Sequence, residues 1–242
     1  MPEHDVTKHA KAIYETMRET HKKWKQKLAD ILVEIAIIVF AISLSLLLER
    51  WRENAHDKTI EKNFLTGLRG DLLSDIQQLK TDSASYNLMY NGWHYLRNSG
   101  LNDTPLNIDS LQLYGASLIG TTQFMPANSR FEALKSSGQF NVIENDSLQN
   151  MILDLYQNKI ITLQSTTTYL TQFKTQQLLP FLSKNIRYTK DGKSNLQQLI
   201  EIPEMQNYLL FGNAAIEAMQ RYHQVIDESY RIINMINKQY GD

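Results

Sequence analysis

Two acidic side chains, Asp30 and Glu34, lie within the most apolar stretch of this 242-residue chain. Between residues 28 and 48, 17 of 21 residues are apolar, and the exceptions are these two acids and two serines. At 100° per residue of an α-helix, Asp30, Glu34, Ala41 and Ser45 fall on one narrow face. Because an ionised group is costly to place among lipid chains, an acid inside a membrane helix is a candidate for function.

Three roles are consistent with Glu34. Its carboxylate can reach out of an apolar layer toward Lys27 or the lipid headgroups. It can instead be protonated and hydrogen-bond the same residue of neighbouring copies, an arrangement that small and polar residues on one face favour. The third role is the transfer of protons across a membrane. The sequence leaves these roles open and predicts an intramembrane polar stripe of Asp30, Glu34 and Ser45.

Residues 28–48 have the length and composition of a transmembrane helix. As a helix they extend about 31 Å, close to the hydrocarbon thickness of a bilayer. Trp24 and Trp51 flank the run, where aromatic side chains anchor a helix at the two membrane interfaces. A soluble core helix would need similarly apolar partners, and a cleavable signal peptide would be shorter and begin earlier. We therefore expect a signal anchor in contact with membrane lipid.

Basic residues near the ends of this run indicate its orientation. Residues 1–27 carry seven Lys and Arg and residues 49–75 carry five, which favours a cytoplasmic N-terminus and an exported segment 49–242. Within residues 1–27, apolar positions recur at helical spacing from Val6 to Trp24. We expect an amphipathic arm that lies on anionic lipid or forms a short coiled coil, the alternative being an ordinary cytoplasmic tail.

Residues 49–242 are expected to form an all-α domain, because Gly (10) and Pro (5) are few and apolar residues recur at helical spacing. The predicted architecture is one N-terminal transmembrane helix that continues into a stalk over residues 49–80, followed by an extramembrane helical bundle. Further helices are predicted over residues 82–97, 146–183 and 204–239. Asp109 and Asp146 have the sequence context of helix N-caps, and Pro180 is expected to kink or end the helix that contains it.

The last predicted helix carries a long apolar seam. From Met205 to Ile233 its apolar residues alternate by steps of four and three, which predicts packing against another helix of the bundle or of another copy. His223 lies on this seam. We expect it to be a hydrogen-bonded core group, because no other metal-ligand residues stand at suitable spacing.

The chain lacks the sequence patterns of common catalytic and cofactor sites. Lys and Arg number 25 against 26 Asp and Glu, a net charge of −1, which argues against nucleic-acid binding. There is no Cys, the six His residues are scattered, and the motifs of nucleotide-binding loops, serine hydrolases and zinc peptidases are absent. We predict no catalytic, cofactor-binding or metal-binding residues and a protein that is not an enzyme.

One segment of the chain carries a family resemblance. It contains Arg130, Phe131, Glu132, Leu134, Ser137 and Gly138, and Ile143, Leu148, Ile152 and Tyr156 follow it. Together with Glu34 in the apolar run and the Trp51-Arg-Glu-Asn54 after it, the segment resembles a domain-of-unknown-function family of single-pass membrane proteins from Bacteroidota. The resemblance spans about residues 22–160. It implies a bacterial inner-membrane anchor with a periplasmic helical domain, and it implies no activity. The chain departs from the family at Leu47-Leu48-Glu49-Arg50, where a polar run would precede the tryptophan.

The same segment has a structural interpretation. Phe131 and Leu134 would anchor a short helix, Ser137-Gly138 would form its left-handed end, and Ile143 would hold the chain before the next helix. The alternative is that Arg130, Glu132, Lys135 and Ser136 line a binding surface.

These features predict a bitopic inner-membrane protein that is a non-catalytic oligomeric scaffold or an accessory subunit of an envelope complex. One alternative is a periplasmic ligand sensor whose stalk relays a signal to the membrane. The other is a proton-coupled membrane component that uses Glu34.

Overall fold

The computed structural model describes residues 3–190 and 193–241, with side chains from residue 27 onward, except at Gln112, and also at Glu15 and Trp24. The regular secondary structure of these residues is helical, which confirms the all-α prediction. The chain divides into two compact units, Met1–Thr59 and Ile60–Asp242.

The first unit is the N-terminal part of one long helix, α1 (Glu3–Leu101), whose C-terminal part belongs to the second unit. No proline occurs inside α1, so its backbone donors are intact. The sequence predicts a stalk over residues 49–80 and a separate helix over 82–97, whereas the structure has one helix through both. At the junction, the hydroxyl of Thr81 donates to the Gln77 carbonyl oxygen at 3.1 Å, a bond that an uninterrupted helix accommodates.

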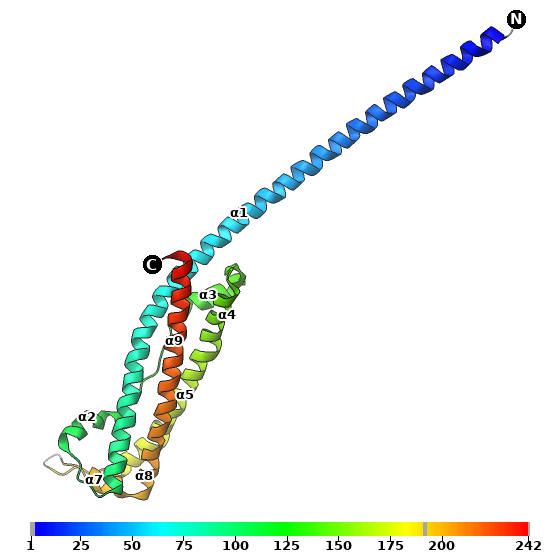
Figure 1. Ribbon diagram of the computed structural model, residues 1–242. Helices are drawn as coiled ribbons and strands as arrows, with labels where there is room; N and C mark the ends of the chain where they lie inside the picture. Colours follow the sequence, from blue (N-terminus) through cyan, green and yellow to red (C-terminus); the bar gives the residue numbers. More distant parts are fainter. Residues whose placement is uncertain (1–2, 191–192, 242) are drawn as a thin grey trace. The chain divides into compact units, whose positions relative to one another are not determined.

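The second unit is a bundle of three long helical segments (Figure 1). They are α1 from residue 60 onward, the run from α4 (Asp146–Asp154) through α5 (Ile160–Phe173) to α6 (Leu179–Asn185), and α9 (Ala214–Tyr240). The first two run in the same direction and α9 runs opposite to both (Figure 1). Residues 60–80 of the predicted stalk are part of this bundle, because Leu65, Leu68, Leu72, Ile76 and Leu79 are buried in its core.

Two parallel helices require a connection that returns along the bundle. Here it consists of α2 (Ile108–Ile119), an extended segment over residues 120–128, α3 (Ser129–Ser136) and the 3₁₀ turn η1 (Gln139–Val142). Two carboxylates of α1 hold the extended segment in place. Asp82 accepts the Thr122 hydroxyl at 2.5 Å, and Asp75 accepts the Ala127 backbone N–H at 3.1 Å.

Two π-helical turns interrupt the middle segment. They are η2 (Leu155–Lys159), between α4 and α5, and η3 (Lys174–Leu178), between α5 and α6. The sequence predicts that Pro180 kinks or ends this helix. In the structure the helix does not end there and continues to Asn185. Pro180 stands in the first turn of α6, directly after η3, and a first helical turn tolerates a missing N–H.

The end of the bundle at the C-terminus of α1 is closed by shorter elements. After α6 the chain makes an isolated antiparallel bridge between Tyr188 and Ser194. It then forms α7 (Leu196–Glu201), α8 (Pro203–Leu210) and the 3₁₀ turn η4 (Phe211–Asn213) before α9 begins. The amide of Gln206 in α8 donates to the carbonyl oxygen of Arg97 at 3.2 Å, which ties this end to α1.

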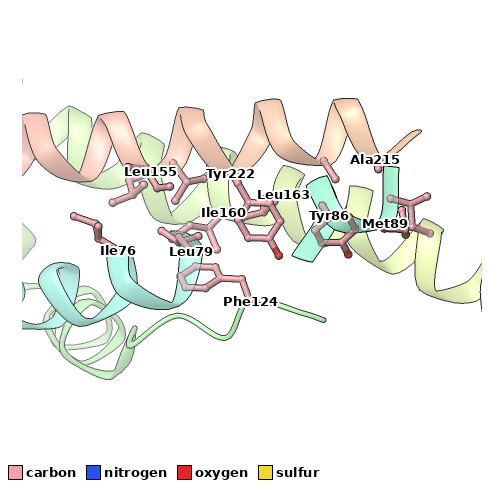
Figure 2. Close-up of a cluster of buried hydrophobic side chains, with 14 of the residues drawn as sticks. Ile76, Leu79, Tyr86, Met89, Phe124, Leu155, Ile160, Leu163, Ala215 and Tyr222 are labelled. Atoms are coloured by element: carbon pink, nitrogen blue, oxygen red, sulfur yellow. The ribbon is translucent and has the colours of Figure 1, made fainter. Parts of the chain in front are cut away.

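One hydrophobic core runs through the bundle, and Figure 2 shows its central part. Side chains from all three segments are fully buried there, including Trp93 of α1, Leu163 of α5 and Tyr222 of α9, and Phe124 of the extended connection is buried with them. The rings of Tyr86 and Tyr222 lie 5.5 Å apart and join α1 to α9. In α1 and in the middle segment, apolar residues that recur at helical spacing are the buried ones, because an i, i+3, i+4 apolar pattern on a helix specifies its buried face.

The last helix differs from the prediction in its rotation. Of the predicted seam, α9 buries Ile226 and Ile233, whereas Ile216, His223 and Tyr230 are exposed. Its other buried apolar positions lie one residue before the predicted ones, at Ala215, Ala218, Tyr222, Val225 and Ile232. His223 is exposed, so its predicted core role is wrong. The 3₁₀ turn η4 advances about 120° per residue instead of 100°, which changes the face that α9 presents.

The helix N-caps also differ from the predicted ones. Asn107, not Asp109, caps α2, because its side-chain oxygen accepts the N–H groups of Asp109 at 2.7 Å and Ser110 at 3.4 Å. Asn145, not Asp146, caps α4 through a bond from the Leu148 N–H at 3.0 Å. Each aspartate lies in the first turn, where its charge interacts favourably with the helix dipole.

Candidate functional site

The polar stripe predicted for the apolar run lies on an exposed helical surface. Residues 27–48, which include Asp30, Glu34 and Ser45, are all exposed on α1. The helix is long and apolar enough to cross a membrane, and none of its most apolar window is buried. A core helix of a soluble protein would be covered by apolar neighbours. The structure thus gives this helix an uncovered apolar surface that one polar stripe interrupts.

The predicted interface anchors flank this surface. Trp24 is 61% exposed and Trp51 is 74% exposed, and both belong to the same helix. The predicted amphipathic arm is helical from Glu3 onward. The side chains of its apolar stripe from Val6 to Thr20 lie outside the described residues.

The segment that carries the family resemblance forms α3 and its C-terminal turn. The Arg130 guanidinium pairs with Asp71 of α1, with 3.0 Å between Nε and a carboxylate oxygen. It lies against Gly67, where a Cβ atom would meet the guanidinium carbon at 2.7 Å. Gly67 therefore lets an arginine lie flat against the helix, so this part of the segment joins the connection to α1.

The remaining residues of the segment build a small aromatic cluster. The ring of Phe131 stacks on Tyr156 of η2, with centroids 4.4 Å apart, and meets Phe140 edge to face. Leu134 is buried beside it, the Ser137 hydroxyl donates to the Leu134 carbonyl oxygen at 2.8 Å, and Gly138 has the predicted left-handed φ of 72°. The structural interpretation is confirmed for these residues. Glu132 is exposed at the rim of a hollow that Tyr156 also lines.

A buried carboxylate, Asp75, lies next to this cluster. Burial raises its pKa to about 6, against a lowering by the Ala127 N–H bond and a smaller raising by the charge of Asp71. The hydroxyl of Tyr156 is buried and has no hydrogen-bond partner among the described residues. Burial raises the pKa of Tyr156, followed by the charges of Asp75 and Asp71. This part of the bundle thus holds polar groups that the fold only partly satisfies.

A second carboxylate, Glu61, closes the end of the bundle where the second unit begins. It is 1% exposed and accepts the Glu144 N–H at 3.1 Å, the Gln239 amide at 3.2 Å and the Tyr240 hydroxyl at 2.8 Å. Burial, followed by the bond to Glu61, raises the pKa of Tyr240 to about 12. One side chain of α1 therefore fixes both the loop before α4 and the last turn of α9.

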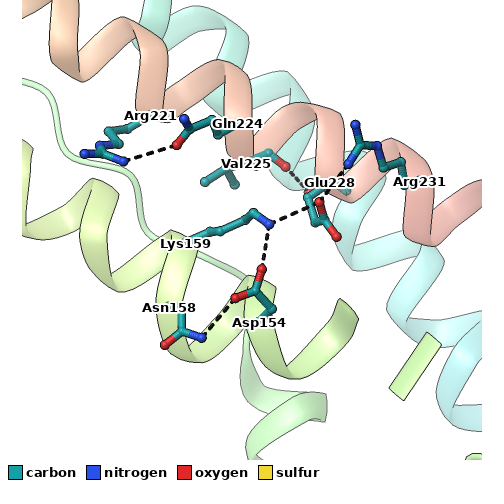
Figure 3. Close-up of polar contacts among 9 residues, drawn as sticks. Asp154, Asn158, Lys159, Arg221, Gln224, Val225, Glu228 and Arg231 are labelled. Atoms are coloured by element: carbon teal, nitrogen blue, oxygen red, sulfur yellow. Dashed lines mark hydrogen bonds and ion pairs between the residues drawn. The ribbon is translucent and has the colours of Figure 1, made fainter. Parts of the chain in front are cut away.

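A third polar group links η2 to α9 (Figure 3). The Lys159 ammonium contacts Asp154 at 2.6 Å and Glu228 at 3.2 Å, and Arg231 lies 3.5 Å from the same Glu228 oxygen. Although burial lowers it, the hydrogen bonds to Asp154 and Glu228 raise the pKa of Lys159. Glu228 is the buried member of this cluster, and its charge is compensated by Lys159 and Arg231.

The fourth polar group is Lys174, the first residue of η3. It is 3% exposed and donates to the carbonyl oxygens of Ser117 at 2.9 Å and Gly120 at 2.5 Å, at the C-terminal end of α2. Its ammonium also lies 5.3 Å from the centroid of the Trp93 ring. Burial lowers the pKa of Lys174 to about 8.

Sequence reasoning did not single out Asp75, Glu61, Glu228 or Lys174. One signal was present in each case, a charged residue at a position that continues an apolar helical stripe. In the part of the chain that the structure describes, no group of three or more His, Cys, Asp or Glu is arranged to hold a metal ion.

No family model matches the chain, and no curated protein or solved structure matches it either. The resemblance to single-pass proteins of Bacteroidota therefore stays a prediction that rests on the residues named above.

Proposed function

We propose that this chain is a bitopic inner-membrane protein whose N-terminus is cytoplasmic and whose helical domain is exported to the periplasm. It acts through protein contacts, as a non-catalytic oligomeric scaffold or an accessory subunit of an envelope complex. The observation that carries the proposal is the exposed apolar surface of α1 with Asp30, Glu34 and Ser45 on one face.

The energetics of this face favour a helical partner over lipid. An acid at the centre of a membrane helix costs about 2.5–3.5 kcal/mol on insertion scales, and Glu34, the seventh residue of the 21-residue run, costs less because it lies nearer one end. A neighbouring helix that offers a hydrogen-bond partner to a protonated Glu34 offsets part of this cost. Ala41 on the same face is small enough for close approach of two helices. A second copy of the same helix supplies all of these features at once.

The absence of cysteine from the chain makes a direct test simple, because a single introduced cysteine reports on its own position. Ser45→Cys lies on the stripe, and Ser43→Cys lies about 160° away around the helix at nearly the same depth. Mild oxidation in native membranes should crosslink Ser45→Cys into a dimer and leave Ser43→Cys monomeric. Equal crosslinking at both positions, or none at either, would refute a homo-oligomer through this face, and capture of a fixed second protein at Ser45 would favour the accessory subunit.

Two substitutions of Glu34 test whether this acid takes part in the assembly. Glu34→Leu removes the hydrogen-bonding group and should reduce crosslinking at Ser45→Cys, whereas Glu34→Gln keeps an amide in its place and should retain it. A Glu34→Leu protein that crosslinks as well as the parent would show that the acid has no part in the assembly.

A ligand sensor is the second candidate, because α1 runs without interruption from the apolar run into the bundle. Such a helix can relay a change at the bundle to the membrane. The test is whether a ligand of the domain changes crosslinking at Ser45→Cys, and whether a Gly-Pro insertion within residues 52–58 removes that response. A response that survives the insertion would argue against mechanical relay.

A further inference from the structure

Lys174 carries a buried charge without a counter-ion. Its partners are the carbonyl oxygens of Ser117 and Gly120 and the face of Trp93, and none of these has a formal charge. Among the residues that the structure describes, no carboxylate forms an ion pair with it, and burial is the only cause that shifts its pKa. Buried lysines are ordinarily paired with an acid, and Lys159 in the same bundle has two.

One of its three N–H groups also has no acceptor among the residues that the structure describes. An ammonium group has three donors, and the two carbonyl oxygens at the end of α2 use two of them. An unused donor on a buried cation is costly unless water or a ligand accepts from it. The ammonium group of Lys174 therefore favours binding of a further hydrogen-bond acceptor, and an anionic acceptor is favoured most.

A cavity of about 200 Å³ borders Lys174 and provides room for such an acceptor. Its apolar wall comes from Met89, Leu88 and Leu170, and Lys174 lies among its lining residues together with the hydroxyl-bearing Ser117. Tyr86 and Met89, two of the buried residues labelled in Figure 2, also line it. Some lining residues, such as Ser85, Leu88, Ala116 and Thr121, are exposed, so the cavity opens to the surface.

The backbone at Lys174 gives an independent indication of a site. The π-helical turn η3 begins at this residue, and π-helical turns inside α-helices frequently occur at functional sites. Pro180 stands after η3, in the first turn of α6, where a missing N–H is tolerated. The proline therefore does not account for where Lys174 is placed. The turn brings a lysine of the middle segment to the C-terminal end of α2.

We propose that this cavity is a binding site for a small monocarboxylate with a short apolar body, whose carboxylate pairs with the Lys174 ammonium. An apolar cavity of about 150 Å³ holds a benzene molecule, so this cavity suits an aliphatic chain of about six carbons. The apolar body packs against Met89 and Leu170, and the carboxylate takes the unused donor of Lys174. The site is a property of the second unit alone and does not depend on how α1 assembles in the membrane.

Trp93 makes the binding directly observable, because its ring lies next to Lys174. The full-length protein in maltoside micelles carries Trp24→Phe and Trp51→Phe, which leaves Trp93 as its remaining tryptophan. Titration with sodium hexanoate should give a saturable change in Trp93 fluorescence. Hexanol lacks the charge and acetate lacks the apolar body, so each should bind roughly tenfold more weakly or worse.

Three variants decide between this site and non-specific uptake. Lys174→Met should abolish saturable hexanoate binding, and Lys184→Met, at an exposed lysine of α6, should leave it unchanged. Ser85→Phe at the exposed rim should block the cavity without removing any bond of Lys174, so it remains informative if Lys174→Met fails to fold by circular dichroism. The proposal is overturned by an absence of saturable hexanoate binding, by hexanol binding as tightly as hexanoate, or by unchanged binding in folded Ser85→Phe.

Discussion

Asp75 should make the helical bundle less stable as the pH rises from 4 to 7. Burial raises the pKa of this carboxyl from 3.8 to about 6 in the folded protein. Between these two pH values the folded state holds a proton that the unfolded state has released, so stability falls as the pH increases. Asp75→Asn removes the titration and keeps an acceptor for the Ala127 N–H, and it should remove this part of the pH dependence.

The magnitude follows from the two pKa values. A difference from 3.8 to about 6 corresponds to about 3 kcal/mol at 1.36 kcal/mol per pH unit. About 2 kcal/mol of this falls between pH 4.5 and pH 7.5, and the remainder falls below pH 4.5, where the unfolded carboxyl releases its proton. Asp75→Asn should therefore gain about 2 kcal/mol over the parent when the pH is raised across this window.

The assay is urea unfolding of the second unit within the full-length protein, followed by the fluorescence of Trp93 after Trp24→Phe and Trp51→Phe. Asp154→Asn is the matched control. Hydrogen bonds from Lys159 and Asn158 lower the pKa of Asp154, so its contribution is lost only as the pH falls below the usual range of an aspartate. The difference in the free energy of unfolding between Asp154→Asn and the parent should be constant from pH 4.5 to pH 7.5. If the free energy of unfolding depended on pH in the same way in the parent and in Asp75→Asn, a raised pKa of Asp75 would be refuted.

Two further predictions concern packing and are checked by the same unfolding assay. Gly212→Ala should destabilise the bundle by about 1–3 kcal/mol, because its Cβ would lie 2.8 Å from the Cβ of Trp93. Gly115→Ala is the control and should be neutral or stabilising, because its Cβ meets nothing within 4 Å. A larger loss of stability in Gly115→Ala than in Gly212→Ala would contradict this packing. Phe131→Ala should cost about 3–5 kcal/mol because its ring is buried and stacked, whereas Glu132→Ala, at the exposed neighbour, should change stability by less than about 0.5 kcal/mol.

The sequence predicts those parts of the fold that depend on a single helix. The apolar spacing from Leu65 to Leu79 identifies the buried face of α1, and the short helix anchored by Phe131 ends at Gly138 where the pattern requires it. Such features follow from local geometry, since the periodicity of one helix specifies one face. The prediction is only partly right in α9, which buries the predicted Ile226 and Ile233 but has His223 on the surface after the 3₁₀ turn η4.

The polar groups inside the bundle depend on partners that are distant in the chain. Glu61 accepts a hydrogen bond from the hydroxyl of Tyr240, 179 positions away, and Lys174 donates one to the carbonyl oxygen of Ser117, 57 positions away. A sequence shows that a charge interrupts an apolar stripe but not which distant carbonyl or hydroxyl meets it. The predicted helix caps were wrong for a more local reason, because an asparagine side chain one or two positions before each aspartate supplied the acceptor.

Each of the two π-helical turns contains one lysine that contacts another element of the bundle, and the difference between the two lysines supports the assignment of a ligand site. Lys159, at the end of η2, meets Asp154 and Glu228, and these carboxylates compensate its charge within the fold. Lys174, at the start of η3, meets carbonyl oxygens and an aromatic face beside a cavity that opens to solvent. If both lysines only tied helices together, both would be expected to have an acid as partner, since an uncompensated buried ammonium is the more costly arrangement. The carboxylate that Lys174 lacks within the described residues is the group that we assign to the ligand.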